Sequence, residues 1–182
     1  VSLAMEPHLQ LKYLLKMDLL LVEDDIDLQK VLAQYLELSG FTVYTANHGK
    51  HGLEVFRKHH IDLCILDVMM PEMDGFEVCR QLKADEASAG IPIIFISALD
   101  ETEGKVKAFT VGGVDYITKP FQFEEVLARV ETHLALRRLQ KELEQEIIER
   151  DKLIAELDAY AHTVAHDLKN SCCPAHFITN NE

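Results

Sequence analysis

The sequence predicts an α/β protein, a doubly wound five-stranded parallel sheet that is followed by a long C-terminal helical region. Over the first two thirds of the chain, short apolar runs alternate with segments of helical periodicity, which is the pattern of βα units around a parallel sheet. Turn residues then become rare, since no glycine follows Gly113 and no proline lies between Pro120 and Pro174. The last third therefore favours continuous helix.

Five strands are expected, each bounded by Asp, Gly, Asn or Pro. They are residues 19–22, 41–45, 61–66, 93–96 and 114–117. Between them, apolar residues recur with helical spacing in the segments 28–36, 53–56, 76–82 and 106–109. Gly40 and the pair Gly112 and Gly113 lie where helix C-caps are needed. The order of the elements is that of a doubly wound sheet.

The region after Phe121 is predicted to form one long helix or two. Its apolar residues step by three and four: Leu127, Val130, Leu134, Leu139, Leu143, Ile147, Ile154, Leu157, Ala161, Val164 and Leu168. The two steps of four between Leu139 and Ile147 form a stutter in a heptad-like seam. A single helix cannot bury such a stripe, so we expect a coiled coil in a parallel homodimer.

Composition narrows the classes of function. The chain has 18 Lys and Arg against 31 Asp and Glu, a formal charge of −13, which disfavours a nucleic-acid partner. No run reaches the roughly 18 apolar residues of a membrane span. Cys64, Cys79, Cys172 and Cys173 lack the spacing of a disulfide framework, which favours a cytoplasmic location.

Acidic and polar residues stand at the ends of the predicted strands. Glu23 and Asp24 follow the first strand, and Asp67 follows the third. Ser97 and Lys119 follow the fourth and fifth. Ligands bind outside the carboxyl ends of such sheets, and carboxylates that converge there suit Mg²⁺. The set is suited to phosphoryl transfer onto an aspartate.

Four separated motifs carry a resemblance to a known family. They are Leu21-Val22-Glu23-Asp24-Asp25, Leu66-Asp67-Val68-Met69-Met70-Pro71-Glu72-Met73-Asp74-Gly75, Ser97-Ala98 and Lys119-Pro120. In this order they resemble the receiver domain of two-component response regulators, over about residues 17–136. The resemblance implies the flavodoxin-like receiver fold.

The resemblance also implies roles in the pocket. Asp67 is then the phosphoacceptor, and Asp67 and Asp24 bind Mg²⁺ directly. Glu23 acts on the metal through water, and the backbone carbonyl of Met69 is a further ligand. The phosphoryl donor is a cognate histidine kinase or phosphotransfer protein, and the receiver catalyses its own phosphorylation and dephosphorylation.

Three further roles follow from the same resemblance. Ser97 and Lys119 bond the phosphoryl group, Tyr116 is the aromatic switch, and the peptide bond between Lys119 and Pro120 is cis. The side chains two residues beyond Asp67 and Ser97 influence attack by water in receivers. Here they are Met69 and Leu99, neither of which orients water by hydrogen bonding, so we expect slow self-dephosphorylation.

A second resemblance lies in the last helix. The segment Leu157-Asp158-Ala159-Tyr160-Ala161-His162-Thr163-Val164-Ala165-His166-Asp167-Leu168-Lys169-Asn170 resembles the phosphoacceptor box of histidine kinases. It implies that His166 is phosphorylatable and that Asp167 is its activating acid, although Ser171 replaces the usual proline. No glycine-rich ATP-binding loop follows Gly113, so we expect no autophosphorylation and interpret the sequence as a fragment of a hybrid response regulator and histidine kinase.

These interpretations divide the chain into segments. They are an N-terminal extension (1–16), a receiver core (17–121) with its last helix at about 122–136, a coiled-coil linker (137–156), a partial histidine-kinase phosphoacceptor helix (157–171) and a tail (172–182).

The expected function is signalling in a two-component phosphorelay, with output through a dimeric C-terminal helix. The alternative is a non-catalytic dimeric adaptor that binds a kinase and in which His166 is inert. A phosphatase of the haloacid-dehalogenase type is disfavoured, because that family needs a second aspartate where Met69 stands. A purely structural interpretation, in which the acids only cap the ends of strands, does not account for their occurrence together at one edge of the predicted sheet.

Overall fold

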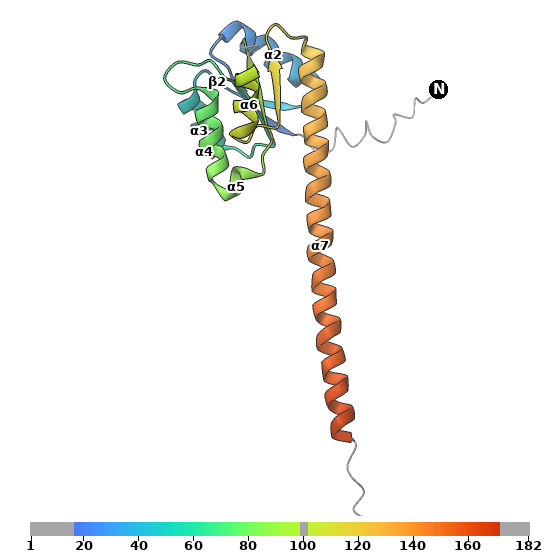
Figure 1. Ribbon diagram of the computed structural model, residues 1–182. Helices are drawn as coiled ribbons and strands as arrows, with labels where there is room; N and C mark the ends of the chain where they lie inside the picture. Colours follow the sequence, from blue (N-terminus) through green and yellow to red (C-terminus); the bar gives the residue numbers. More distant parts are fainter. Residues whose placement is uncertain (1–16, 99–101, 172–182) are drawn as a thin grey trace, which may run out of the picture. The chain divides into compact units, whose positions relative to one another are not determined.

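The computed structural model describes residues 17–98 and 102–171, and the side chains up to residue 168 (Figure 1). The chain divides into two compact units, Val1–Arg137 and Arg138–Glu182. The N-terminal extension (1–16), Leu99 and the tail (172–182) lie outside the described residues.

The first unit contains the predicted five-stranded parallel sheet, in the order β2-β1-β3-β4-β5. Its strands are β1 (Asp18–Val22), β2 (Thr42–Ala46), β3 (Leu63–Asp67), β4 (Ile93–Ser97) and β5 (Asp115–Thr118). The ladder pairs Asp67 with Ile96 and Ser97 with Thr118. Asp67 and Ser97 are therefore the last residues of their strands, one residue later than the sequence predicts.

Helices follow the strands as expected. They are α2 (Ile26–Leu38), α3 (Gly49–Lys58), α4 (Gly75–Ala84), α5 (Glu86–Ala89), α6 (Thr102–Thr110) and α7 (Phe123–Ser171). The sequence did not predict α5, because four small and acidic residues carry no apolar periodicity. The Asp85 side chain caps this helix by accepting a hydrogen bond from the backbone N–H of Ala87.

The sheet has a hydrophobic layer on each face, because successive strand residues point to opposite sides. On one face, Leu20, Leu66 and Phe95 pack with residues of α3, α4 and α6. On the other, Leu21, Ile65 and Ile96 pack with α2 and the first turns of α7. All of β3 and β4 is buried, so the third and fourth strands read as continuous apolar runs.

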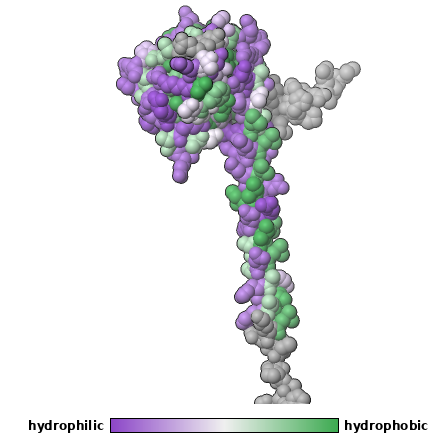
Figure 2. All heavy atoms as spheres, in the orientation of Figure 1, coloured by the Kyte–Doolittle hydropathy of each residue, from purple (hydrophilic) through white to green (hydrophobic). Residues whose placement is uncertain are grey.

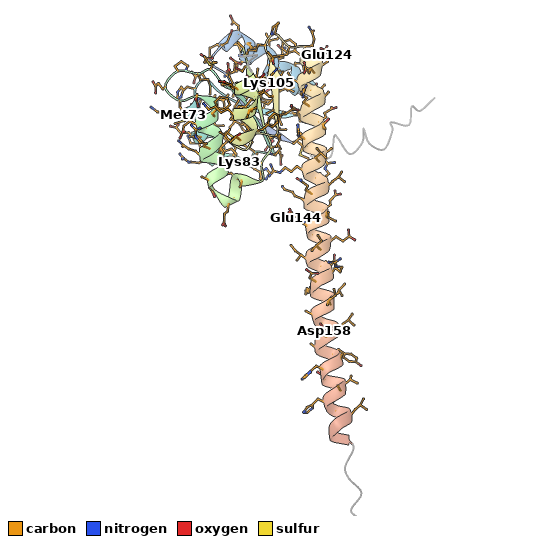
Figure 3. The ribbon with its side chains drawn as sticks, in the orientation of Figure 1. Met73, Lys83, Lys105, Glu124, Glu144 and Asp158 are labelled. Atoms are coloured by element: carbon orange, nitrogen blue, oxygen red, sulfur yellow. The ribbon has the colours of Figure 1, made fainter. Side chains whose placement is uncertain are left out.

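The region after Phe121 is one helix, α7, with 49 residues. We call residues 138–171 of α7 the distal helix. Every side chain from residue 139 to 168 is exposed, including those of the apolar stripe, which is visible along this helix in Figure 2. The acidic side chains of Glu144 and Asp158 also project outward from it (Figure 3). Among the described residues, no helix is both long enough and apolar enough to cross a membrane.

Candidate functional site: an acidic pocket at the strand ends

The first part of the pocket is the turn between β1 and α2. The backbone N–H of Glu23 donates to the carbonyl of Ala46 at 3.1 Å, which prolongs the pairing of β1 with β2 by one residue. Asp25 then caps the N-terminus of α2, since its side chain accepts hydrogen bonds from the backbone N–H groups of Asp27 and Leu28. The result is a tight turn in which Glu23 is buried and Asp24 is exposed.

The second part is the end of β3. Asp67 is only 4% exposed, and its Oδ1 accepts a hydrogen bond from the backbone N–H of Met69 at 3.0 Å. The loop then folds back so closely that a Cβ at Gly75 would clash with the carbonyl oxygen of Asp67. Only glycine fits at that position, which explains why Gly75 follows the acidic strand end at this spacing.

Lys119 joins the two acids. Its Nζ donates to both carboxylate oxygens of Glu23, at 3.0 and 2.8 Å, and to Oδ2 of Asp67 at 2.7 Å. Lys119 follows β5 directly, and the peptide bond between Lys119 and Pro120 is cis, as expected. One ammonium group therefore bridges two buried carboxylates that come from different strands.

Burial sets the electrostatics of this cluster. Desolvation raises the pKa of Glu23 to about 7, because the hydrogen bond from Lys119 offsets it only in part and Asp67 adds like charge. Burial alone would lower the pKa of Lys119, but its bonds with Asp67 and Glu23 outweigh desolvation and raise that pKa. Lys119 therefore stays charged, while Glu23 takes up a proton as the pH falls through about 7.

The acids have the geometry of a cation site. One carboxylate oxygen from each of Glu23, Asp24 and Asp67 lies within 4.8 Å of the others. All three are hard oxygen donors, and Asp24 faces solvent, which leaves room for water ligands. This donor set fits Mg²⁺.

Comparison with known proteins identifies the family. Residues 19–131 match the model of the response regulator receiver domain. The chain belongs to this family. As a receiver it is similar to the probable transcriptional regulator ycf27 of Cyanidium caldarium, with 42% identity over 122 residues, 67% of this chain and 47% of the relative. It is also similar to the transcriptional regulatory protein RprY of Bacteroides fragilis, with 40% identity over 132 residues, 72% and 55% of the two chains. The receiver chain thus spans about half the length of these curated relatives.

Solved structures agree with this assignment. A putative response regulator from Chloroflexus aurantiacus matches with a TM-score of 0.64 and 30% identity, over 66% of this chain and 99% of that chain. The signal receiver domain of a signal transduction histidine kinase from Syntrophus aciditrophicus matches with a TM-score of 0.61 and 31% identity, over 65% and 90%. The sheet order is therefore that of a receiver fold.

Two other predicted residues lie on β4 and β5, the strands that follow β3 in the sheet of this receiver. Ser97 is fully buried at the end of β4, and its carbonyl accepts a hydrogen bond from the backbone N–H of Lys119 at 2.7 Å. Tyr116 is almost fully buried in β5, where it pairs in register with Phe95. Both residues thus lie on strands next to the pocket.

His166 and Asp167 belong to the second compact unit. Their side chains are 67% and 73% exposed, and Nδ1 of His166 lies 3.6 Å from Oδ1 of Asp167. The side chains of the apolar stripe on the same helix are exposed as well. Glu23 and Asp67 are buried together in the pocket, whereas this pair is in solvent.

One polar residue beside the pocket, Gln29, is not among the residues that the sequence motifs single out. Gln29 is buried on the inward face of α2, and its Nε2 donates to the carbonyl oxygens of Glu23 and Ala46. The available signal was an amide seven residues before Leu36, on a helix face that is otherwise apolar. The apolar spacing over residues 28–36 predicts a helix but gives Gln29 no role.

Proposed function

We propose that this receiver accepts a phosphoryl group on Asp67 from the phosphohistidine of a cognate histidine kinase or phosphotransfer protein, with Mg²⁺ in the acidic pocket. The observation that carries the proposal is the Lys119 bridge. Its ammonium group holds Oδ2 of Asp67 while the Met69 amide holds Oδ1, so the nucleophile is oriented and charge-compensated.

The chemistry is a direct transfer. The nitrogen–phosphorus bond of the donor breaks, a bond forms from a carboxylate oxygen of Asp67 to phosphorus, and the imidazole keeps the electron pair and gains a proton from solvent. Glu23, Asp24, Asp67 and the carbonyl of Met69 would hold Mg²⁺, which supplies charge neutralisation for the phosphoryl oxygens when bound. Lys119 turns from the carboxylates to the new phosphoryl oxygens, and the Ser97 hydroxyl donates to another.

The structural change on phosphorylation is then transmitted through β5. The carbonyl of Ser97 accepts a hydrogen bond from the backbone N–H of Lys119, and β4 pairs with β5. A shift of β4 toward the phosphoryl group therefore changes the packing around Tyr116. Tyr116 is the switch residue in this proposal. Its strand begins at Asp115, which hydrogen-bonds Arg129 and His133 of α7.

The output element is the distal helix, as a parallel homodimer. Support comes from the exposed stripe that includes Leu139, Leu143 and Leu157, because a helix with an unburied apolar seam is stabilised by a matching helix. A second copy supplies an identical seam, which a parallel pairing brings into register.

The test of the phosphoacceptor is intact mass after incubation with Mg²⁺ and acetyl phosphate. We expect one phosphate adduct on the wild type and none on Asp67→Asn. Asp74→Asn is the matched control: it changes an acid in the loop after the same strand, and its amide still caps α4. An adduct on Asp67→Asn, or none on the wild type in the presence of bound Mg²⁺, would contradict the proposal.

The second candidate is the non-catalytic dimeric adaptor. It is favoured by the surroundings of His166, whose side chain lies in solvent next to Asp167, in the part of α7 (residues 139–168) where every side chain is exposed. His166→Gln discriminates between the two: loss of phosphate flow between the purified protein and its donor kinase would assign a phosphohistidine role. Unchanged flow would leave Asp67 as the acceptor and favour an inert His166.

We also propose that phospho-Asp67 hydrolyses slowly. Met69 is exposed beside the phosphoacceptor, and its thioether cannot orient an attacking water. Met69→Asn introduces a side chain that can, so we expect it to shorten the lifetime measured by loss of the phosphate adduct. A wild-type half-life of only seconds would overturn the idea.

A further inference from the structure

Gln29 is an unusual member of its helix face. It is 7% exposed, and the other buried residues of α2 are Leu32, Ala33 and Leu36, which form part of the core. A buried primary amide is destabilising unless its polar atoms are hydrogen-bonded. The position of Gln29 therefore depends on specific acceptors.

Those acceptors are two backbone carbonyls at the edge of the pocket. Nε2 of Gln29 donates to the carbonyl oxygen of Glu23 at 2.8 Å and to that of Ala46 at 2.8 Å, and both bonds are buried. Val22 and Ala46 are the last residues paired between β1 and β2, and the Glu23 N–H also donates to Ala46. Gln29 thus links the two strands just where their ladder ends.

The Glu23 carbonyl belongs to the peptide group that joins Glu23 to Asp24. Because a peptide group is planar, a bond that orients this carbonyl also orients the two Cα atoms on either side. Two of the three carboxylates of the candidate Mg²⁺ site, those of Glu23 and Asp24, extend from those atoms. A shift of this peptide would move both at once.

We infer that Gln29 is a positioning residue for the Mg²⁺ site: its amide fixes the peptide between Glu23 and Asp24 and so sets the affinity of the acidic pair for the cation. This inference rests on the proposed function of the pocket. Both hydrogen bonds of Gln29 go to backbone carbonyls, so it acts on cation binding through the backbone.

The test separates cation binding from the transfer step. Gln29→Met keeps the length and the packing of the side chain but removes both donors. We expect the Mg²⁺ concentration that gives half the maximal rate of phosphorylation by acetyl phosphate to rise about tenfold, as for other residues that orient metal ligands. The rate at saturating Mg²⁺ should stay close to that of the wild type, because Asp67 and Lys119 are unchanged.

Leu36→Val is the matched control. Leu36 lies on the same buried face of α2, seven residues from Gln29, and its truncation destabilises the helix packing without touching the turn. Its Mg²⁺ midpoint should equal that of the wild type. A Mg²⁺ midpoint for Gln29→Met that equals the wild-type midpoint would overturn the inference. An increase in the midpoint for Leu36→Val as large as that for Gln29→Met would overturn it as well.

Failure of the proposed function gives a different result. If the wild type takes up no phosphate, calorimetric titration with Mg²⁺ alone still compares the Mg²⁺ affinities of wild type and Gln29→Met, and equal affinities overturn the role of Gln29.

If Gln29→Met does not fold, NMR of the wild type tests the inference instead. The side-chain amide protons of Gln29 should exchange slowly with solvent and shift on addition of Mg²⁺, unlike those of exposed Gln122. Exchange as fast as that of Gln122 contradicts the inference.

Discussion

The receiver unit and the distal helix use the same apolar residue types in opposite ways. In β3 and β4 every residue is buried, because helices cover both faces of the sheet. From residue 139 to 168, every side chain is exposed. The receiver sheet is stabilised by contacts within the unit, whereas the apolar stripe of the distal helix has its side chains exposed.

The two regions also treat charge differently. In the pocket, Lys119, Glu23 and Asp67 are held together with little access to water, so burial raises the pKa of Glu23 to about 7. His166 and Asp167 face solvent at 3.6 Å, where water screens their interaction. Only the first arrangement is preorganised for chemistry, which is why Asp67 carries the proposed function.

The largest expected effect is on the buried core. Phe95 is fully buried and its ring lies 5.1 Å from that of Phe76. Phe95→Ala should lower the free energy of unfolding by about 3–5 kcal/mol, because it leaves a cavity. Leu143→Ala is the control in the distal helix, and below the concentration at which chains pair it should leave receiver unfolding in urea unchanged. Equal losses of unfolding free energy in Phe95→Ala and Leu143→Ala would contradict the contrast between the receiver unit and the distal helix.

The next effect concerns the attachment of the first turns of α7 to β5. Asp115 accepts hydrogen bonds from Arg129 at 2.7 Å and His133 at 3.0 Å. Asp115→Asn should cost about 2 kcal/mol at neutral pH, since it weakens bonds to a charged group. Asp158→Asn, in the exposed distal helix, should leave urea unfolding unchanged.

The pH dependence of that difference has a definite sign. Burial alone would raise the pKa of Asp115, but the bonds from Arg129 and His133 outweigh it and hold the pKa below its usual value. The ionised carboxylate therefore stabilises the fold above its ordinary pKa, and this stabilisation is lost as the pH falls through the lowered value. Wild type and Asp115→Asn should converge below about pH 4. A difference that grows in acid would contradict this.

The third effect is on association. In the proposed dimer, Leu143 lies in the seam, so Leu143→Ala should weaken dimerisation about tenfold, or about 1.4 kcal/mol. Sedimentation equilibrium measures the change. Lys141→Ala, two residues away and off the apolar stripe, is the control and should not alter the dissociation constant. If the wild type is monomeric at high protein concentration, the proposed dimer is wrong.

The smallest effect is on a helix cap. Asp74 precedes α4 and its Oδ1 accepts a hydrogen bond from the backbone N–H of Glu77 at 2.7 Å. Asp74→Ala should cost about 1 kcal/mol, seen as a lower melting temperature of the receiver. Asp158→Ala, in mid-helix, should not lower it, because alanine favours helix. A lower melting temperature for Asp158→Ala, without a decrease for Asp74→Ala, would contradict this prediction.

The sequence by itself determined the sheet, the acidic strand ends and the long helix. These depend on local signals: apolar runs bounded by turn residues, charged residues directly after them, and the absence of glycine and proline late in the chain. The ends of β3 and β4 were missed by one residue, because the last ladder pairs depend on neighbouring strands. The choice between one and two helices after Phe121 also needed the structure.

Only the tertiary structure decided which polar residues meet. Gln29 looks like a surface glutamine until α2 is packed and its amide reaches the carbonyls of Glu23 and Ala46. The bonds of Asp115 with α7 likewise join residues that are 14 and 18 positions apart. Sequence periodicity reports which face of an element is apolar, but a hydrogen bond between elements depends on distances that exist only after the core has formed.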